Sequence, residues 1–328
     1  MLQQLESFWF PVMPSEELQP QPQMVPLLGR QLVLWRAADQ RPAALNNRCR
    51  HRSAALSDGA VDADGHLHCP YHGWVFASDG HCLAIPQDPN LTIPEHCRVE
   101  AYQTQERYGL IWVCLAPEPR LPLPSLPQAE QDNVRRISGF HEVWNCSAFR
   151  VIENGLDNFH HYFVHRGVLD ATSPIPDPID GPITTTADGL RFSIPLRLSN
   201  STRLEATIET GLDTLVVQRT VRWMAPLGLS LDLQWPNGRQ QTIVLFATPQ
   251  DAATCKILRF YLRNDKETEV RAADVISLER ALIDQDRRIL EGMPGGNDPW
   301  PADEWLIAAD LPIARMRQQL QKFLAISS

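Results

Sequence analysis

Alternation of hydrophobic and polar positions runs through most of the chain and predicts a protein built mainly of β-strands. Over the first 116 or so residues, short runs rich in β-branched and aromatic residues, at 31–35 and 109–115, are separated by turn signals such as Ser57-Asp-Gly59. Alternating segments in the second half are expected at 189–196, 203–210, 214–224, 228–235, 240–248 and 253–264. This pattern indicates a small all-β domain followed by a larger antiparallel sheet.

Two segments break the alternation and have helical spacing. One helix is expected from Ser147 to about His165, and a longer one from Glu267 to Gly292, which Gly292 and Pro294 end. An apolar stripe runs along the longer helix at spacings of three, four and seven residues: Val275, Leu278, Leu282, Ile289 and Met293. These elements predict the α+β class, with the long helix against the antiparallel sheet of the second domain, an arrangement of the helix-grip type.

Chain length and proline content suggest where the two domains meet. A length of 328 residues is typical of about two domains, and residues 117–127 contain five prolines. Such a stretch is typical of a stiff linker. We therefore expect a first domain at 1–118, a linker at 119–127 and a second domain at 128–328.

Composition and charge exclude several classes of function. The net charge of −9 disfavours binding to nucleic acid, which needs clustered Lys and Arg. No run reaches about 18 apolar residues, and the first residues lack the basic and apolar regions of a secretory signal. We expect a cytoplasmic protein that binds neither nucleic acid nor membranes, with its seven cysteines reduced or bound to metal.

Metal-binding residue types are concentrated in the first half of the chain. All ten histidines lie at or before His165, and six of the seven cysteines lie at or before Cys146. A metal site that is completed from the second half must therefore use a carboxylate there.

Two short loops each combine a cysteine with a histidine, as Cys49-Arg-His51 and Cys69-Pro-Tyr-His72. Together they offer two thiolates and two imidazoles, and Gly73 follows where a backbone must turn tightly. Three interpretations compete: a chance grouping, a structural Cys2His2 zinc site and a Rieske [2Fe–2S] centre. Zinc fingers usually pair cysteines within one loop, whereas two histidines replace two cysteines on one iron of a Rieske cluster.

The pattern and spacing of these loops resemble the Rieske family. The resemblance implies that Cys49 and Cys69 bind one iron of the cluster and that His51 and His72 bind the other. The chain departs from the family at Arg50, where a proline is usual. That residue lies between two ligands and does not itself bind iron.

A second group of potential ligands lies near the end of the first expected helix and contains Asp157, His160, His161 and His165. Two histidines and one carboxylate form the facial triad of non-haem Fe(II) oxygenases. On a regular helix His161 and His165 share one face, whereas His160 and His165 lie about 140° apart. Spacing alone therefore favours His161 as the partner of His165.

The third ligand is sought on the long helix. Asp286 falls within its apolar stripe, where a carboxylate is costly unless it is paired or bound to metal. Asp284 points to the opposite face, and Glu279 lies near the stripe as a weaker candidate. We expect Asp286 to be the ligand, and the alternative is a buried Asp286 paired with an arginine.

The sequence Asn154-x-x-Asp157-x-x-His160-x(4)-His165 resembles the catalytic-domain motif of Rieske non-haem iron oxygenases. The resemblance implies that His160 and His165 bind Fe(II) in a helix that is distorted or ends between them, and His161 remains the competitor. The stretch 285–290 also resembles the family segment that supplies the carboxylate ligand, which again selects Asp286.

The resemblance gives Asp157 a role in electron transfer. It implies that Asp157 links His72 of one subunit to His160 of the next, in a homotrimer. The alternative is that Asp157 orients an iron-bound histidine of its own subunit. Both roles are compatible with one carboxylate.

The order of the two domains matches the oxygenase component of this family and is most similar to its α-only branch, which includes O-demethylases and cyanobacterial alkaloid hydroxylases. The resemblance implies a hydroxylase with a Rieske [2Fe–2S] cluster, a mononuclear Fe(II) and O₂ as co-substrate. Electrons are expected from a separate ferredoxin or ferredoxin reductase, since the chain lacks nucleotide-binding and plant-type ferredoxin motifs. We expect monooxygenation of a small organic molecule, including oxidative demethylation. The alternatives are a cis-dihydroxylating dioxygenase, an electron-transfer protein with an inactive catalytic half, and a zinc-dependent hydrolase.

Overall fold

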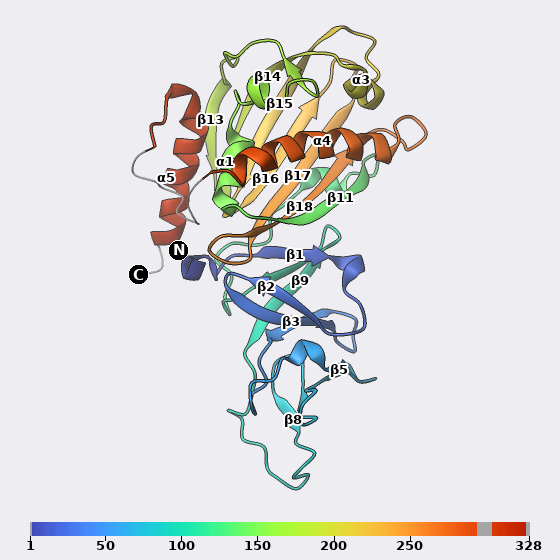
Figure 1. The fold of residues 1–328 in the computed structure, drawn as a ribbon, viewed down its shortest axis with the longest axis vertical. Helices are drawn as coiled ribbons and strands as arrows, with labels where there is room; N and C mark the ends of the chain where they lie inside the picture. Colours follow the sequence, from blue (N-terminus) through green and yellow to red (C-terminus); the bar gives the residue numbers. More distant parts are fainter. Residues whose placement is uncertain (1, 294–303, 326–328) are drawn as a thin grey trace. The chain divides into compact units, whose positions relative to one another are not determined.

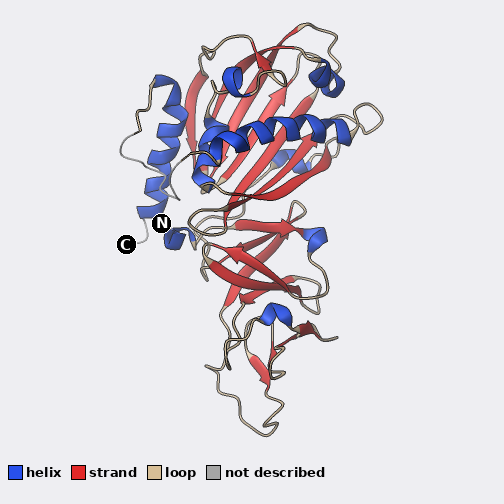
Figure 2. Cartoon of the chain, in the orientation of Figure 1, coloured by secondary structure: helices blue, strands red, loops and turns tan. Residues whose placement is uncertain are grey.

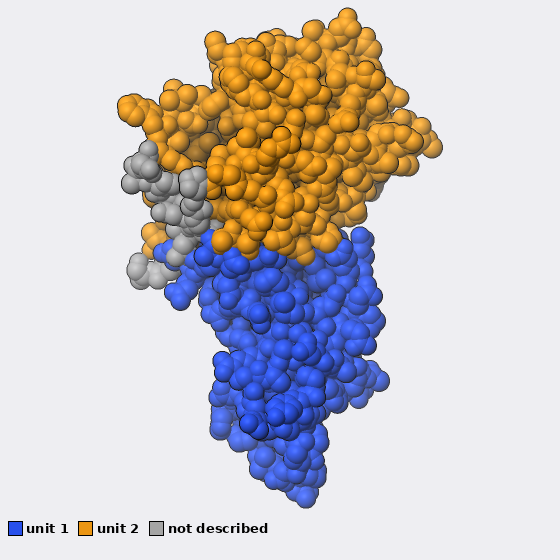
Figure 3. All heavy atoms as spheres, in the orientation of Figure 1, with its two compact units in different colours: residues 1–123, 248–252 blue, residues 124–247, 253–328 orange. Residues whose placement is uncertain are grey.

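The computed structural model describes residues 2–293 and 304–325 and divides the chain into two compact units (Figure 3). Unit 1 comprises residues 1–123 and 248–252, and unit 2 comprises residues 124–247 and 253–328. The first boundary lies within the proline-rich stretch 119–127. Pro294, expected at the end of the long helix, lies outside the described residues.

Unit 1 is built from two small sheets (Figure 1). The strands of the six-stranded sheet are, in spatial order, β1 (Phe10–Pro14), β10 (Leu110–Cys114), β9 (Ala101–Arg107), β4 (Pro42–Asn46), β3 (Arg30–Arg36) and β2 (Gln23–Leu27). The four-stranded sheet contains β5 (Ala60–Val61), β6 (Leu67–His68), β7 (Val75–Phe76) and β8 (Cys82–Ala84). The strands expected at 31–35 and 109–115 are β3 and β10, which bury Trp35 and Trp112 completely.

Unit 2 contains one large antiparallel sheet (Figures 1 and 2). Its strands are, in spatial order, β11 (Arg135–Trp144), β18 (Cys255–Arg263), β17 (Gln240–Pro249), β16 (Gly228–Gln234), β15 (Thr214–Met224), β14 (Gly189–Ser199) and β12 (Asp170–Ala171), and β13 (Asp180–Thr186) also pairs with β14. The predicted α+β class with an antiparallel second domain is confirmed.

The α-helices of the described residues lie in unit 2. They are α1 (Ala148–Leu156), α2 (His161–Val164), α3 (Thr202–Ile208), α4 (Ala272–Leu290) and α5 (Leu311–Ala325). Figure 1 shows α4 crossing one face of the large sheet. Among the described residues, none of the helices combines the length and the apolar character that crossing a bilayer requires.

Two of the expected elements are wrong. The segment 203–210 forms a helix, α3, rather than a strand, because Ser201 caps it by accepting a hydrogen bond from the backbone N–H of Leu204. Its buried side chains Leu204, Thr207 and Ile208 then recur at helical spacing. The helix expected over 147–165 ends at Leu156 and resumes as α2.

The apolar stripe of the long helix is only partly as expected. Ile289 and Met293 are 46% and 42% exposed, so their assignment to the stripe is wrong. The buried face of α4 instead carries Val275, Leu278, Glu279, Ile283, Asp286 and Leu290. Asp286 is buried and Asp284 is exposed, as the periodicity predicts.

One buried carboxylate of unit 2 links strands β11 and β18 to the turn between β16 and β17. Asp265 accepts hydrogen bonds from Arg263 (2.9 Å from Nε), from Arg135 (2.7 Å from Nη2) and from Arg239 (3.3 Å from Nη1). Burial opposes the ionisation of Asp265, but the hydrogen bonds and charges of Arg263 and Arg135 outweigh it and hold its pKa below the ordinary value. Ionised Asp265 therefore stabilises the fold.

We expect Asp265→Asn to lower the free energy of unfolding by roughly 1.5–3 kcal/mol at pH 7, because charged hydrogen bonds are lost within a buried group. A depressed folded-state pKa contributes stability above the unfolded value of about 3.9, and this contribution disappears as the pH falls through the folded value. The difference between the urea midpoints of wild type and Asp265→Asn should therefore be smaller at pH 3 than at pH 7. The exposed Asp284→Asn serves as the control, and an equal loss there would contradict the prediction.

Candidate metal centres

The two Cys–His loops of unit 1 have the same backbone geometry. In the first, the N–H of Cys49 donates to the carbonyl of Ala54 (2.9 Å), and the N–H of Ser53 donates to the carbonyl of Cys49 (3.0 Å). The second repeats this pattern from Cys69, with Trp74 and Gly73 in the corresponding positions, at 2.8 and 3.0 Å.

The fourth residue after each cysteine adopts a left-handed conformation, with φ of 62° at Ser53 and 68° at Gly73. Glycine meets this requirement without strain, whereas Ser53 carries the steric cost of a side chain there. The Ser53 hydroxyl accepts a hydrogen bond from Arg48 Nε at 2.7 Å, which holds the loop in place. The tight turn predicted at Gly73 is therefore present.

The side chains of the two loops converge. Cys49 and Cys69 are buried, and their thiols lie within hydrogen-bonding reach of each other. The rings of His51 and His72 lie 4.5 Å apart, and Trp74 stacks on His51 at 4.6 Å. His72 Nδ1 is buried without a hydrogen-bond partner. A pair of neighbouring thiols and a pair of neighbouring imidazoles, one of them with an unsatisfied nitrogen, fit a metal cluster.

The break between α1 and α2 has a local cause. Asp157 follows the last residue of α1, and its Oδ1 accepts hydrogen bonds from the backbone N–H groups of Phe159 (2.8 Å) and His160 (3.3 Å). These N–H groups are thereby withdrawn from the helix, because Asp competes with backbone carbonyls for them. His160 is the N-cap residue of α2 and His165 is its C-cap residue, so the two histidines lie at the ends of one short turn of helix and not on a long regular helix.

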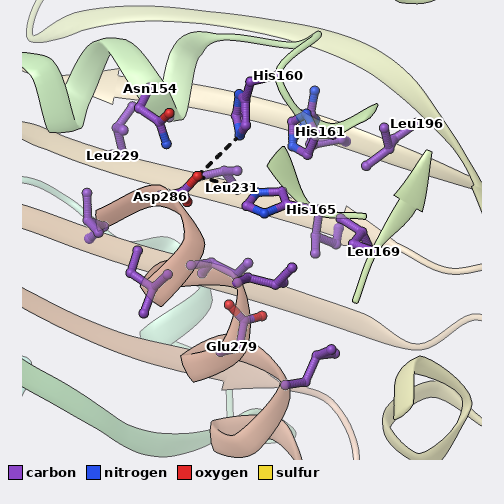
Figure 4. A pocket seen from close by; sticks show the side chains of 18 of the residues that line it. Asn154, His160, His161, His165, Leu169, Leu196, Leu229, Leu231, Glu279 and Asp286 are labelled. Atoms are coloured by element: carbon purple, nitrogen blue, oxygen red, sulfur yellow. Dashed lines mark hydrogen bonds and ion pairs between the residues drawn. The ribbon is translucent and has the colours of Figure 1, made fainter. Parts of the chain in front are cut away.

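The two histidines at the ends of α2 face the same carboxylate. The Nε2 atoms of His160 and His165 lie 3.7 and 3.5 Å from Asp286 Oδ1 (Figure 4). One potential ligand atom from each of the three residues lies within 4.8 Å of the others. Asp286 Oδ1 is buried without a hydrogen-bond partner, as a metal ligand would be before the metal is added.

These three residues lie on the wall of a cavity of about 130 Å³. Most of the other lining side chains are apolar, among them Leu196, Leu198, Leu204, Leu229, Leu231 and Leu233. An apolar cavity with a few convergent polar groups is the usual form of a small-molecule site.

Comparison with known proteins identifies a domain family in each half of the chain. The Rieske [2Fe-2S] domain matches residues 8–102, and the vanillate O-demethylase oxygenase C-terminal domain matches residues 144–325. The chain belongs to the Rieske oxygenases. The family predicted from the motifs is confirmed, and the first domain is one that carries a Rieske [2Fe–2S] cluster.

Relatives of this Rieske oxygenase include two demethylases of Pseudomonas putida. Methylxanthine N1-demethylase NdmA is 36% identical over 182 residues, which span 53% of this chain and 51% of that protein. Methylxanthine N3-demethylase NdmB is 27% identical over 91% of this chain and 82% of that protein. The solved structure of an NdmA mutant with caffeine has a TM-score of 0.84 at 26% identity, covering 98% of this chain and 92% of that one. The aligned sequence thus spans about half of NdmA, while the structural match extends over nearly the whole chain.

Gln285 and Asp157 each contact the Nδ1 atom of one candidate ligand histidine, on the side of the ring away from Asp286. Gln285 Nε2 donates to the carbonyl of Arg166 (3.5 Å), which leaves its Oε1 to accept from His165 Nδ1 at 3.1 Å. The lone pair of His165 Nε2 then faces Asp286. Asp157 Oδ2 lies 3.6 Å from His160 Nδ1. Burial opposes ionisation of Asp157, but His160 and backbone N–H groups outweigh it and lower its pKa.

His161, the histidine favoured by spacing alone, is engaged elsewhere. Its Nε2 lies 3.0 Å from Arg219 Nη1 and must accept, because a guanidinium only donates. Burial, followed by the charges of His160 and Arg219, holds the pKa of His161 well below its ordinary value. His161 is therefore neutral, and His160 is the one that faces Asp286.

The alternative carboxylate, Glu279, is also engaged. It accepts a hydrogen bond from Gln241 Nε2 at 2.8 Å and forms an ion pair with Arg259. The pairing of Glu279 with Gln241 and Arg259 thus explains why it is buried on α4. Pairing with an arginine was also the alternative expected for Asp286. Asp286 itself contacts only the two histidines among the ion pairs of the described residues.

Sequence reasoning missed Arg219 altogether. The inward positions of β15 alternate as Leu215, Val217, Arg219, Val221 and Trp223, all of them buried. An arginine in an otherwise apolar alternating row is a detectable signal, because a buried charge needs a partner. Only the fold, however, reveals that this row faces the cavity.

Proposed function

We propose that this protein is the oxygenase component of an O₂-dependent system that hydroxylates a small organic molecule, by monooxygenation that includes oxidative demethylation. The supporting observation is that His160, His165 and Asp286 meet on the wall of a largely apolar cavity. The names of NdmA and NdmB, two demethylases, support demethylation as the form of the reaction.

Two sets of residues would hold the cofactors. Cys49, Cys69, His51 and His72 would bind the [2Fe–2S] cluster, and His160, His165 and Asp286 would bind Fe(II). The orphaned His72 Nδ1 and Asp286 Oδ1 fit these roles. The cluster supplies one-electron transfer, and the mononuclear iron supplies O₂ activation for oxidation of a C–H bond.

The surrounding side chains then position the reactants. Gln285 and Asp157 fix the two imidazoles, so that their Nε2 lone pairs point to one place. The leucines of the cavity exclude water from the reacting atoms and hold the apolar body of the substrate. The protein's contribution is orientation and a dry environment.

Electrons would come from a separate ferredoxin or ferredoxin reductase. Arg48, Arg50 and Arg52 are exposed around the first cluster loop and offer positive charge to an acidic donor. We further propose a homotrimer in which Asp157 joins His72 of one subunit to His160 of the next. Asp157 supports this role because its side chain contacts His160 and is still 21% exposed.

The first test is iron content and spectroscopy of anaerobically purified protein. The proposal predicts about three irons per chain, a Rieske-type EPR signal after dithionite reduction, and O₂ uptake stimulated by substrate. About two irons that Fe(II) cannot increase would point to an electron carrier. Zinc without an EPR signal, or turnover without O₂, would overturn the oxygenase assignment.

A further inference from the structure

Arg219 is a buried cation on the wall of the cavity. It is 2% exposed and, among the ion pairs of residues 2–293 and 304–325, none joins it to a carboxylate. Arg259 lines the same cavity, but its charge is balanced by Glu279. Burial lowers the pKa of Arg219 to about 10, and Asp157 is the carboxylate whose charge opposes this effect. Arg219 is thus a charged group that lacks a direct counter-ion.

The hydrogen bonds of Arg219 are also incomplete. A guanidinium has five N–H groups. Nη1 donates to His161 Nε2 at 3.0 Å and Nη2 donates to Asn158 Oδ1 at 2.6 Å, while Nε is buried without a partner. A buried N–H group on a charged side chain that makes no hydrogen bond lowers the stability of the fold, so its presence in Arg219 calls for an explanation.

Among the other polar residues of the cavity wall, Thr207 and Gln241 have partners in the protein, whereas Trp235 Nε1 and Arg259 Nε are buried without one. Thr207 donates to the carbonyl of Leu204 (2.8 Å), and Gln241 is hydrogen-bonded to Glu279 and Arg263. Arg219 shares the cavity wall with mainly apolar side chains, many of them leucines. The ring of His161, which Arg219 contacts, stacks on His160 at 4.2 Å. Arg219 is thus separated from the candidate iron ligands by a single side chain.

We propose that Arg219 binds a carboxylate of the substrate, so that the substrate class is a small organic acid with an apolar body. The carboxylate would accept from Nε–H and from the second N–H of Nη2, supplying the missing counter-ion and partners. The apolar body would fill the leucine-lined space next to His160, His165 and Asp286. This inference rests on the proposed function, since it assigns the substrate of the same site.

A purely structural role for Arg219 makes a different prediction. Through Asn158 and His161 the guanidinium holds the segment between α1 and α2. If that were its whole role, acids and neutral analogues would bind equally well, and a substitution would weaken both together. Discrimination between an acid and its amide therefore separates the two roles.

The experiment is calorimetric titration of the iron-loaded protein with benzoate and 3-methoxybenzoate, and with the primary amide of each. We expect each acid to bind at least about tenfold more tightly than its amide. Arg219→Met should abolish this preference and leave the affinity for the amides unchanged. Arg219→Lys should retain part of it, because the charge remains. Arg222→Met is the matched control, since Arg222 lies on the same strand and pairs with Asp188 instead.

Two results would overturn the inference. The first is that no acid binds, or that wild-type protein binds acids no better than amides, a comparison that needs no variant. The second is an unchanged acid preference in folded Arg219→Met; if that variant does not fold, a fully unchanged preference in Arg219→Lys has the same force. Iron content and O₂ uptake are measured on the same samples. About three irons per chain, with O₂ uptake that only neutral molecules stimulate, would leave the proposed function intact and exclude only an organic acid as the substrate.

Discussion

Replacing Asp286 with alanine is expected to remove the mononuclear iron and leave the Rieske cluster in place. Iron content should fall from about three to about two atoms per chain, and substrate-stimulated O₂ uptake should be lost completely. The physical reason is that Asp286 Oδ1 is the buried oxygen towards which both His160 and His165 direct Nε2, at 3.7 and 3.5 Å. Metal analysis with EPR of the reduced cluster provides the measurement.

His161→Ala is the matched control for this prediction, because His161 is an immediate neighbour that contacts Arg219 rather than Asp286. It should retain about three irons. Loss of one iron in His161→Ala with full iron in Asp286→Ala would replace the ligand set with the one that helical spacing alone favours. Loss of the cluster signal in either variant would indicate misfolding instead.

Replacing Asp157 with asparagine is expected to slow oxidation of the reduced cluster by about 10–100-fold, the usual effect of removing a group that supports a metal ligand. The carboxylate lies 3.6 Å from His160 Nδ1, and its lowered pKa keeps it ionised at neutral pH. Asparagine keeps the shape and one acceptor oxygen, so the break after α1 should persist. Stopped-flow absorbance of the cluster, with substrate and O₂ present, measures the rate.

Iron content separates the two roles of Asp157. If it carries electrons between subunits, Asp157→Asn keeps about three irons and transfer alone becomes slow. If it only orients His160, the variant should bind Fe(II) more weakly, and added Fe(II) should restore the rate. Asp157→Glu retains the charge and should recover part of the transfer rate in the first case. An unchanged rate with full iron would contradict both roles.

The two metal-binding motifs could be predicted from sequence because their residues are close together in the chain. Each Cys–His pair lies within one tight loop, and backbone hydrogen bonds inside that loop determine its shape. Asp286 could be predicted for a related reason, because helical periodicity alone places it on the buried face of α4. Periodicity failed for Ile289 and Met293, which are exposed; Met293 lies beyond Leu290, the last residue of α4.

Several features were decided only by the tertiary structure. The choice of His160 over His161 depends on the short helix α2, which begins after His160 and ends before His165, whereas periodicity assumes one regular helix. The segment 203–210 is a helix because of its cap and its packing, although its sequence also suits a strand. The sequence by itself therefore determined the Rieske [2Fe–2S] domain and its place before the second domain, since the motifs depend on local residue spacing. The cavity and the exposure of Arg219 to it depend on which strands lie beside each other, and contacts between distant segments decide that.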